Sequence, residues 1–532
     1  MAVNMDASEG TAVEESGGRE VRSTVVMTGL RFGGKMLGLL KTLVIAAAFG
    51  ASGALDAFWV AYMLPMLMPG LILGVVTTAF IPSFMRTAKN GAEEVDWRGL
   101  NTLFTLVTVL VFAATALVWL GRMQLVKIMA PGMSPEVHAL AAQLTGTMAI
   151  AVFIFGINSI LSAILQALHR FAVMSLESII TNVFIIAGAI LLSRSHGVHG
   201  LVWSVIAGFG VHMLLLIWAT RDIILRKLRP AFDITHVDFT GSAAHMLPLF
   251  VGFFGSISMT IIDRMFVSTL DEGAISVLVY AGMIALLPME VFGHAVFTAF
   301  YPGLSRDHAA GRVLAMRDAQ VRGMRLLLFV LLPATVMIVI GANALITLLL
   351  ERGAFTAEAG RLTAATMAAL ALGLPFRAVN YFNFRVFHAR REPWTAVFIG
   401  LFGVSLNIVL DILMIGPFGV IGIAFATSIA MLCCSIVSTL LLQRRQRASI
   451  VRPMLRPVGK LITMTAVFAV VALALLQIVG IAAADLVRWQ RLMLELSVFV
   501  PAGAAFLFAG HILGFEEART MNLVAARALQ RG

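Results

Sequence analysis

The feature that most constrains this chain is a series of long apolar segments, joined by short polar connections, that fills almost its whole length. A helix needs about 20 apolar residues to cross the roughly 30 Å hydrocarbon core of a bilayer. Fourteen segments meet this length, at 27–50, 56–84, 99–120, 140–167, 173–193, 199–219, 243–268, 275–301, 323–349, 362–387, 394–415, 419–442, 459–480 and 492–513. The sequence therefore predicts an all-α polytopic membrane protein with fourteen transmembrane helices.

Composition leads to the same class of protein. Of the 532 residues, 60% are hydrophobic and 13% are charged, and the mean hydropathy is +0.94. A soluble domain is about half apolar and a quarter charged, so this chain could not solvate its surface in water. The net charge of +11 would suggest nucleic acid in a soluble protein. Here most Lys and Arg residues lie in short loops, which topology explains, and we expect no nucleic-acid partner.

The distribution of these basic residues predicts an orientation. Residues 1–26 are polar, mixed in charge and without an apolar core, which is typical of a cytosolic tail rather than a cleaved signal peptide. With the N-terminus inside, the inner loops hold twenty Lys and Arg residues and the outer loops hold seven. The positive-inside rule therefore places both termini, including the tail 514–532, in the cytoplasm.

An internal repeat divides the chain. Thr78–Arg86 resembles Thr298–Arg306 at an offset of 220 residues. Two further pairs follow in the same order, Ala167–Arg170 with Phe387–Arg390 and Gly197–Gly200 with Gly419–Gly422. The offset covers six helices, an even number, so the halves are parallel repeats related by an axis along the membrane normal. We predict an N-lobe at 27–226 and a C-lobe at 243–442, with helices thirteen and fourteen, 459–513, outside the repeat.

Charged residues inside predicted spans are candidates for a functional site, because each costs roughly 2.5–3.5 kcal/mol on insertion. They are Lys35 and Lys41 in span one, Asp263 and Arg264 in span seven, and Arg377 and Arg385 in span ten. Lys41 lies too deep to snorkel, so we expect it to face a cavity. Arg385 either snorkels to the inner interface or faces the cavity. Asp263 and Arg264 either serve the cavity or pair with charges on other helices.

Other polar and small residues in the spans suggest packing. Gly34 and Gly38 form a small-xxx-small pair that lets a neighbouring helix approach span one. Further candidates for buried acids are Glu177, Glu290, Asp411 and Glu495. Glu290 and His294 lie one turn apart, which suits either packing or a proton or metal pair.

The chain carries no enzyme motif. It has no phosphate-binding glycine loop followed by Lys and Ser or Thr. Its two cysteines, Cys433 and Cys434, are adjacent, which is not a metal-ligand spacing. The predicted outer loop at 121–139 is too short for a catalytic domain. We therefore expect a non-enzyme without catalytic residues, metal ligands or a cofactor.

Several segments resemble the MurJ/MviN family, the lipid II flippases of the MOP exporter superfamily. They are Phe49–Ala51, Leu55–Phe58, Leu64–Pro65, Ala130–Gly132, Glu351–Thr356, Arg385–Pro393 and Ile415–Pro417. The resemblance covers nearly the whole chain and implies a multi-pass protein of the bacterial cytoplasmic (inner) membrane that works by alternating access. It further implies a cationic cavity for the pyrophosphate and sugars of a polyprenyl-linked substrate, and a groove for the tail at helices thirteen and fourteen.

We predict substrate binding at Lys35, Lys41, Asp56, Asp263, Arg264, Arg377 and Arg385. The resemblance supplies the positions of Lys35 and Lys41, and Arg264 and Arg377 are candidates to replace family cations that this chain lacks. Several family positions differ here. Lys35 and Lys41 replace two arginines, which keeps the charge but loses bidentate phosphate geometry. Thr42 replaces an acid, Met68–Gly70 stand where basic residues are usual, and Ala281–Met283 follow Tyr280 in place of Ala-Asp-Arg.

Four hypotheses remain open from the sequence. The first is a flippase that moves lipid II, the peptidoglycan precursor for cell wall and cell shape, from the inner to the outer leaflet. The second is a flippase for another polyprenyl-linked oligosaccharide, used for exopolysaccharide or O-antigen. The third, a membrane glycosyltransferase or ligase, needs a sizeable outer loop that the chain lacks. The fourth is a non-transporting scaffold. A flippase would contact membrane lipids and cell-wall or polysaccharide synthesis machinery, with the membrane potential or an ion gradient as its energy source.

Overall fold

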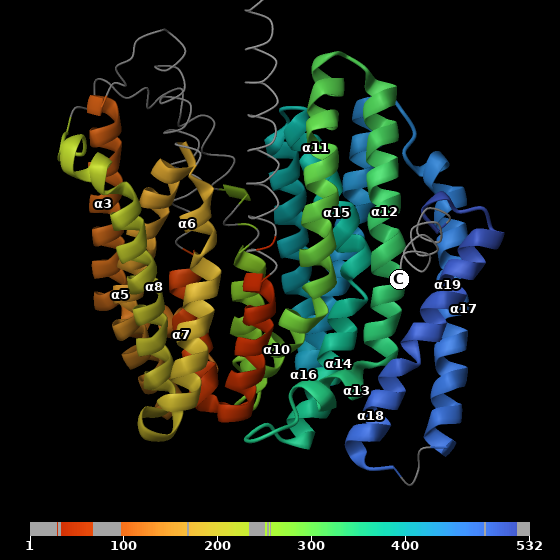
Figure 1. The fold of residues 1–532 in the computed structure, drawn as a ribbon, viewed down its shortest axis with the longest axis horizontal. Coiled ribbons are helices and arrows are strands. Elements are labelled where there is room, and N and C mark those ends of the chain that lie inside the picture. The colour runs from red at the N-terminus through yellow and green to blue at the C-terminus, as the bar shows by residue number, and fades with distance from the viewer. Residues whose placement is uncertain are drawn as a thin grey trace, which may run out of the picture. The chain divides into compact units, whose positions relative to one another are not determined.

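The computed structural model describes residues 29, 33–67, 97–167, 170–232, 251–252, 255, 257–482 and 486–518 (Figure 1). Regular structure in these residues is helical throughout. The expectation of an all-α membrane protein is confirmed. The N-terminal tail 1–26, the second half of predicted span two and the first copy of the repeated segment at 78–86 lie outside the described residues.

The count of fourteen transmembrane helices stays a prediction. Seven helices of the described residues are long and apolar enough to cross a membrane, or up to ten if each of three bent pairs counts as one span. One such pair, α14 (Ala357–Ala371) and α15 (Leu374–Ala389), occupies the predicted span 362–387 and bends by 43°. An apolar window along the sequence cannot show where such a bend falls, because both halves of a bent pair are equally apolar.

Two helices each contain a break at equivalent glycines of the repeat. Gly197 in α8 (Ser193–Arg226) has φ 53° and ψ −137°. Gly419 in α16 (Pro393–Gln446) has φ 55° and ψ −136°. Positive φ is costly for residues with a Cβ, which is why glycine occupies both breaks. The agreement within two degrees gives the third repeated segment the same backbone conformation in both copies.

The described chain forms two compact units, and the first comprises residues 1–49, 53–128 and 134–253. Unit 1 contains the helices 33–49 and Gly53–Leu67, then α3 (Trp97–Leu120), α4 (Arg122–Met129), α5 (Pro135–Ala167), α6 (Phe171–Ser175), α7 (Glu177–Leu191) and α8. Helix α5 packs against both α3 and α8, and α7 packs against α8. Val111, Leu161 and Leu216 belong to the shared core of α3, α5 and α8. Gly156 allows the close approach of α3, since a Cβ there would lie 2.3 Å from Val111.

Unit 2 comprises Gly50–Ser52, Met129–Met133 and Phe254–Gly532. After the helical residues 257–267 it contains α10 (Ala274–Ala285), the π-helical turn η2 (Met289–Gly293), α11 (His294–Ala309), α12 (Val313–Ile340), α13 (Ala342–Leu349), α14, α15, α16, α17 (Val451–Ala482), α18 (Arg488–Ser497) and α19 (Phe499–Ile512). Helix α12 contacts α11, α15 and α17, and α17 contacts α19. Phe329, Phe468 and Phe506 belong to the core of α12, α17 and α19.

Residues of three segments that resemble the MurJ/MviN family belong to unit 2, and two of these segments are in contact. The hydroxyl of Tyr280 donates to the carbonyl of Gly50 at 3.2 Å. A Cβ on Gly50, which has φ 63°, would lie 2.4 Å from the carbonyl oxygen of Ala354. The backbone N–H of Gly132 donates to Oγ of Ser268 at 3.1 Å. Glycine is needed at Gly50 because both its backbone angle and its close contact exclude a side chain.

Candidate functional site

In unit 1, the helix 33–49 is held against α7 across its two glycines. Nδ2 of Asn182 donates to the carbonyl of Gly34 at 3.1 Å and to Oγ of Ser178 at 3.2 Å. A Cβ on Gly34 would lie 2.8 Å from Oγ of Ser178, and one on Gly38 would lie 3.6 Å from Nδ2 of Asn182. The predicted small-xxx-small contact of this helix is therefore confirmed, and its neighbour is α7.

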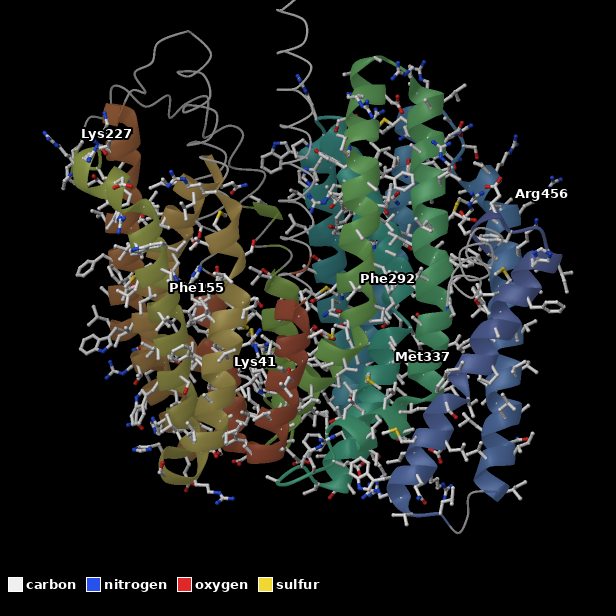
Figure 2. All side chains as sticks on the ribbon, viewed as in Figure 1. Lys41, Phe155, Lys227, Phe292, Met337 and Arg456 are labelled. Carbon is white, nitrogen blue, oxygen red and sulfur yellow. The ribbon has the colours of Figure 1, made fainter. Side chains whose placement is uncertain are left out.

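The predicted cationic residues of unit 1 lie on this same helix. Lys41 is half-buried and Lys35 is exposed, and Figure 2 labels Lys41 on the red helix 33–49. The two ammonium groups are close enough to interact electrostatically. Asp56, on Gly53–Leu67, is buried. Glu177, at the start of α7, is half-buried and interacts electrostatically with Tyr62.

In unit 2, a cluster of buried polar side chains forms around Asp263. Nδ2 of Asn407 donates to Oδ1 of Asp263 at 2.7 Å and to Oδ2 of Asp411 at 2.8 Å. The hydroxyl of Thr427 donates to Oδ2 of Asp263 at 3.2 Å. Asp263 is 9% exposed and Asp411 is fully buried. We call Asp263, Asn407, Asp411 and Thr427 the acid cluster; it joins the residues 257–267 to both halves of α16.

The acid cluster is not fully hydrogen-bonded by the described residues. Asp263 interacts electrostatically with Arg264 and with Arg377 of α15, so it has a charged partner on another helix, as one of the two alternatives from the sequence expected. Oδ1 of Asp411 and Oδ1 of Asn407 are buried acceptors without a hydrogen-bond partner among the described residues. Buried acceptors of this kind are uncommon in proteins because of their desolvation cost. The cluster therefore has the oxygen atoms to accept a proton or a small cation.

Arg385 is held by aromatic rings. Its guanidinium lies 4.7 Å from the ring centroid of Phe297 on α11 and 5.3 Å from that of Tyr381 on α15. The side chain is half-buried. Cation–π contacts stabilise a guanidinium by about 0.5–2 kcal/mol, so these rings fix the group at one place between α11 and α15.

Three of the four acids expected to be buried are not fully buried. Glu290 in η2 is exposed, and Glu177 is half-buried. Glu495 is also half-buried and forms an ion pair with Arg491, one turn away on α18, at 3.0 Å. Asp411 is buried as expected. An apolar run indicates depth in the membrane but not the helix face, and the prediction failed at these three acids because the face decides burial. The side chain of His294 lies outside the described part of the structure.

A second buried polar network was not predicted. Nε2 of Gln320 donates to Oδ1 of Asn383 at 2.8 Å, and Nδ2 of Asn383 donates to the hydroxyls of Ser438 and Thr439 at 2.9 and 3.0 Å. These side chains lie on α12, α15 and α16. They carry no charge, so we assign them to the structure of unit 2. Neutral polar residues occur in many membrane helices, so no signal in the sequence singled these out.

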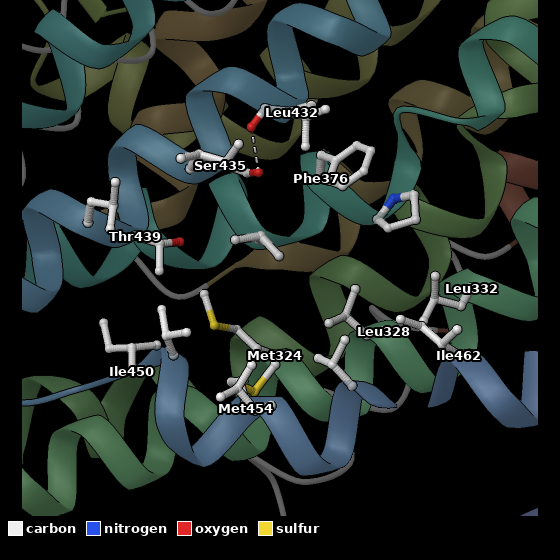
Figure 3. Close-up of a pocket in the computed structure, with 17 residues that line it drawn as sticks. Met324, Leu328, Leu332, Phe376, Leu432, Ser435, Thr439, Ile450, Met454 and Ile462 are labelled. Atoms are coloured by element: carbon white, nitrogen blue, oxygen red, sulfur yellow. Dashed lines mark hydrogen bonds between the residues drawn. The ribbon is translucent and has the colours of Figure 1, made fainter. Parts of the chain in front are cut away.

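An apolar cavity of about 540 Å³ lies among α12, α15, α16 and α17 (Figure 3). Leu328 on α12, Phe376 on α15, and Met454 and Ile462 on α17 are among its lining residues. Its two polar residues are already hydrogen-bonded: the hydroxyl of Ser435 donates to the carbonyl of Leu432 at 2.7 Å, and that of Thr439 accepts from Asn383. No lining residue comes from α18 or α19, so this cavity does not lie between helices thirteen and fourteen.

Comparison with known proteins identifies relatives over most of the chain. A family model described as "Lipid II flippase MurJ" matches residues 45–486. A "Probable lipid II flippase MurJ" of Synechocystis is 26% identical over 450 residues, 82% of this chain and 84% of that protein. A "Probable lipid II flippase MurJ" of Thermotoga maritima is 27% identical over 429 residues, which are 79% of this chain and 85% of that protein.

Solved structures share the fold. An inward closed conformation of lipid II flippase MurJ superposes with a TM-score of 0.73 at 23% identity, over 91% of this chain and 98% of that one. An inward-facing multidrug resistance MATE family transporter of the MOP superfamily superposes with a TM-score of 0.63 at 15% identity. The superposition covers 79% of this chain and 98% of that one. At these identities the superpositions establish the fold alone.

Proposed function

This chain belongs to the lipid II flippase MurJ family, and from that premise we propose that it moves lipid II from the inner to the outer leaflet of the cytoplasmic membrane by alternating access. It is a multi-pass membrane transporter rather than an enzyme. The observation that carries this proposal is the family match over residues 45–486. Because the curated relatives over the same region are also lipid II flippases by name, lipid II is favoured over another polyprenyl-linked oligosaccharide.

Each unit offers cations for the diphosphate of such a substrate. A diphosphate sheds water on entering a cavity, and fixed positive charges offset that loss more strongly away from bulk solvent. Lys41 is the leading candidate because it is half-buried on a helix whose position α7 fixes. Lys35 accompanies it in unit 1. In unit 2, Arg264 and Arg377 interact electrostatically with Asp263, and Arg385 lies against aromatic rings. Because these three guanidinium groups already have partners in the protein, they rank behind Lys41 as ligands for the diphosphate.

For the lipid tail we propose the apolar cavity among α12, α15, α16 and α17. Its lining is almost entirely aliphatic and aromatic, and its two hydroxyls are engaged. A polyprenyl chain can occupy such a space without stripping water from polar groups. This site involves the first half of α17 rather than the whole of 459–513.

Transport needs a source of energy, and the acid cluster is our candidate for coupling to an ion gradient. Arg264 and Arg377 offset the charge of Asp263. However, a charged Asp411 at its buried position is costly unless a proton or a monovalent cation neutralises it. The hydrogen bonds of the cluster join the residues 257–267 to both halves of α16, on either side of the break at Gly419, and an ion bound there would strengthen this connection. Binding of the ion can in this way favour one arrangement of these helices.

We further propose that both termini face the cytoplasm, from the excess of Lys and Arg in the loops on that side. Contacts with the enzymes that make or polymerise the precursor would follow from the place of a flippase between those two steps.

The proposal is tested with purified protein in lipid vesicles that contain either fluorescent lipid II or a polyprenyl-linked O-antigen precursor. We expect transfer of lipid II between leaflets and little transfer of the other lipid. Lys41→Ala should abolish transfer and Lys41→Arg should retain it, because a point charge suffices to hold a diphosphate. Met454→Trp should fill the apolar cavity and slow transfer of long-tailed but not short-tailed lipid II.

Equal transfer of both lipids would favour the broader substrate class, and transfer of neither would favour the scaffold hypothesis. Normal transfer by Lys41→Ala would move the anion site elsewhere without affecting the assignment of function.

A further inference from the structure

A second cavity, of about 490 Å³, lies where α11 and α15 end in unit 2. Tyr301, Ser305 and His308 of α11 line it, together with His388 of α15 and Arg391, which follows that helix. Ala309 and Ala389 complete the lining. The cavity shares no residue with the acid cluster or the apolar cavity. Its polar groups are two imidazoles, a guanidinium and two hydroxyls, without a carboxylate.

The two helix ends that form this cavity are built alike. At the end of α11, the N–H of Gly311 donates to the carbonyl of His308 at 3.0 Å, and that of Arg312 to Asp307 at 2.8 Å. At the end of α15, the N–H of Arg391 donates to the carbonyl of His388 at 3.0 Å, and that of Glu392 to Phe387 at 2.9 Å. Both are Schellman turns. Each places a histidine three residues before the residue with positive φ.

The residue with positive φ differs between the two ends. At the end of α11 this residue is Gly311, with φ 67°, and glycine is usual at this position. At the end of α15 it is Arg391, with φ 59°. A left-handed conformation costs free energy for a residue with a Cβ. Among the described residues, Arg447 is the one other non-glycine residue with positive φ. Glycine would relieve the strain at Arg391, but it would remove the guanidinium from the cavity lining.

The acids next to this cavity are engaged elsewhere. Asp307 pairs with Arg312 at 2.8 Å. Glu392 pairs with Arg390 at 2.9 Å and with Arg445 at 3.3 Å. Within the part of the chain that the structure describes, Arg391 forms no ion pair with any of them. The positive charge on the lining is therefore available to a ligand.

We propose that this cavity binds a phosphate group. Guanidinium, imidazole and hydroxyl donors together suit the oxygens of a phosphate or diphosphate ester. A divalent metal would need carboxylate or thiolate ligands beside the histidines, and the charge of Arg391 opposes it. The phosphate belongs either to a diphosphate ester or to an anionic phospholipid headgroup. The proposal concerns binding alone and does not rest on the transported substrate.

The test uses the full chain in nanodiscs of phosphatidylcholine, with inorganic pyrophosphate titrated by calorimetry. We expect saturable binding that Arg391→Asn weakens by about tenfold or more. Asparagine tolerates the left-handed conformation, so this variant keeps the turn while it removes the charge. Arg447→Asn is the matched control, since it removes the same charge from another positive-φ position, and its affinity should equal that of the wild type. A double variant, His308→Gln with His388→Gln, should also weaken binding.

Added phosphatidylglycerol in the nanodisc separates the two sources of phosphate. Competition with pyrophosphate identifies a lipid headgroup site, and its absence identifies a diphosphate site; both outcomes support the proposal. It is overturned if neither pyrophosphate nor phosphatidylglycerol binds, if Zn²⁺ binds in their place, or if Arg391→Asn and Arg447→Asn have the same affinity.

Discussion

At the scale of single residues, the chemistry of unit 2 centres on two carboxyl groups joined by one amide. Asn407 donates to both Asp263 and Asp411, which leaves its own oxygen and Oδ1 of Asp411 without hydrogen-bond partners among the described residues. Arg264 and Arg377 interact electrostatically with Asp263 and offset its charge. In our proposal, a proton or a monovalent metal ion occupies the remaining acceptors of the cluster.

This arrangement predicts a specific effect of Asp411→Asn. The variant keeps the size of the side chain but removes a negative charge, so the cluster no longer needs an ion. We expect transport of lipid II in vesicles to lose its dependence on an imposed sodium or proton gradient, while the amount of folded protein stays unchanged. Asp271→Asn makes the same change at an exposed position and should leave the dependence intact. If Asp411→Asn responded to the gradient as the wild type does, coupling would lie outside the acid cluster.

The sequence indicated which residues of this cluster were unusual, but not their partners. Asp263 and Asp411 stood out because acids are rare in apolar spans. Asn407 and Thr427 did not, since neutral polar residues occur in many membrane helices. Their role depends on which face of α16 meets the residues 257–267, and that is a property of packing. Packing also decides the exposure of Glu290, which could not be inferred from the position of that residue in an apolar run.

At the scale of helices, glycines set the closest contacts. Gly34 meets Ser178 and Asn182 of α7, whereas the adjacent Gly33 has open space where its Cβ would lie. Spacing alone predicted this contact, because a small-xxx-small pair places both residues on one face. The break at Gly419 lies at the boundary between the predicted spans 394–415 and 419–442, and the break at Gly197 lies between 173–193 and 199–219. The sequence therefore indicated the position of both breaks.

The two neighbouring glycines of the helix 33–49 give a matched test of its packing. Gly34→Leu forces a side chain against Ser178 of α7, and overpacking typically costs about 1–3 kcal/mol. We expect a lower melting temperature in detergent and less protein in the membrane. Gly33→Leu introduces the same residue one position away and should change neither. Equal destabilisation by both variants would mean that helix propensity, and not contact with α7, explains the effect.

At the scale of the whole molecule, charge patterning predicts how the chain is oriented. Reporter fusions at Gln446, the last residue of α16, and at Ser134, between α4 and α5, should report opposite compartments, with Gln446 in the cytoplasm. The positive-inside rule gives this result because Arg444, Arg445 and Arg447 adjoin the first site. Both fusions on one side of the membrane would contradict the predicted orientation and the order of the spans between them.

As a member of the lipid II flippase MurJ family, this chain should move lipid II across the cytoplasmic membrane. The most direct measurement is made in bacteria depleted of their own lipid II flippase and supplied with this chain, with an externally added enzyme that cleaves lipid II only at the outer leaflet. We predict that the wild-type chain restores both growth and cleavage, and that Lys41→Ala, at equal abundance in the membrane, restores neither. Lipid II that stays protected from the enzyme in cells containing abundant wild-type protein would contradict the account.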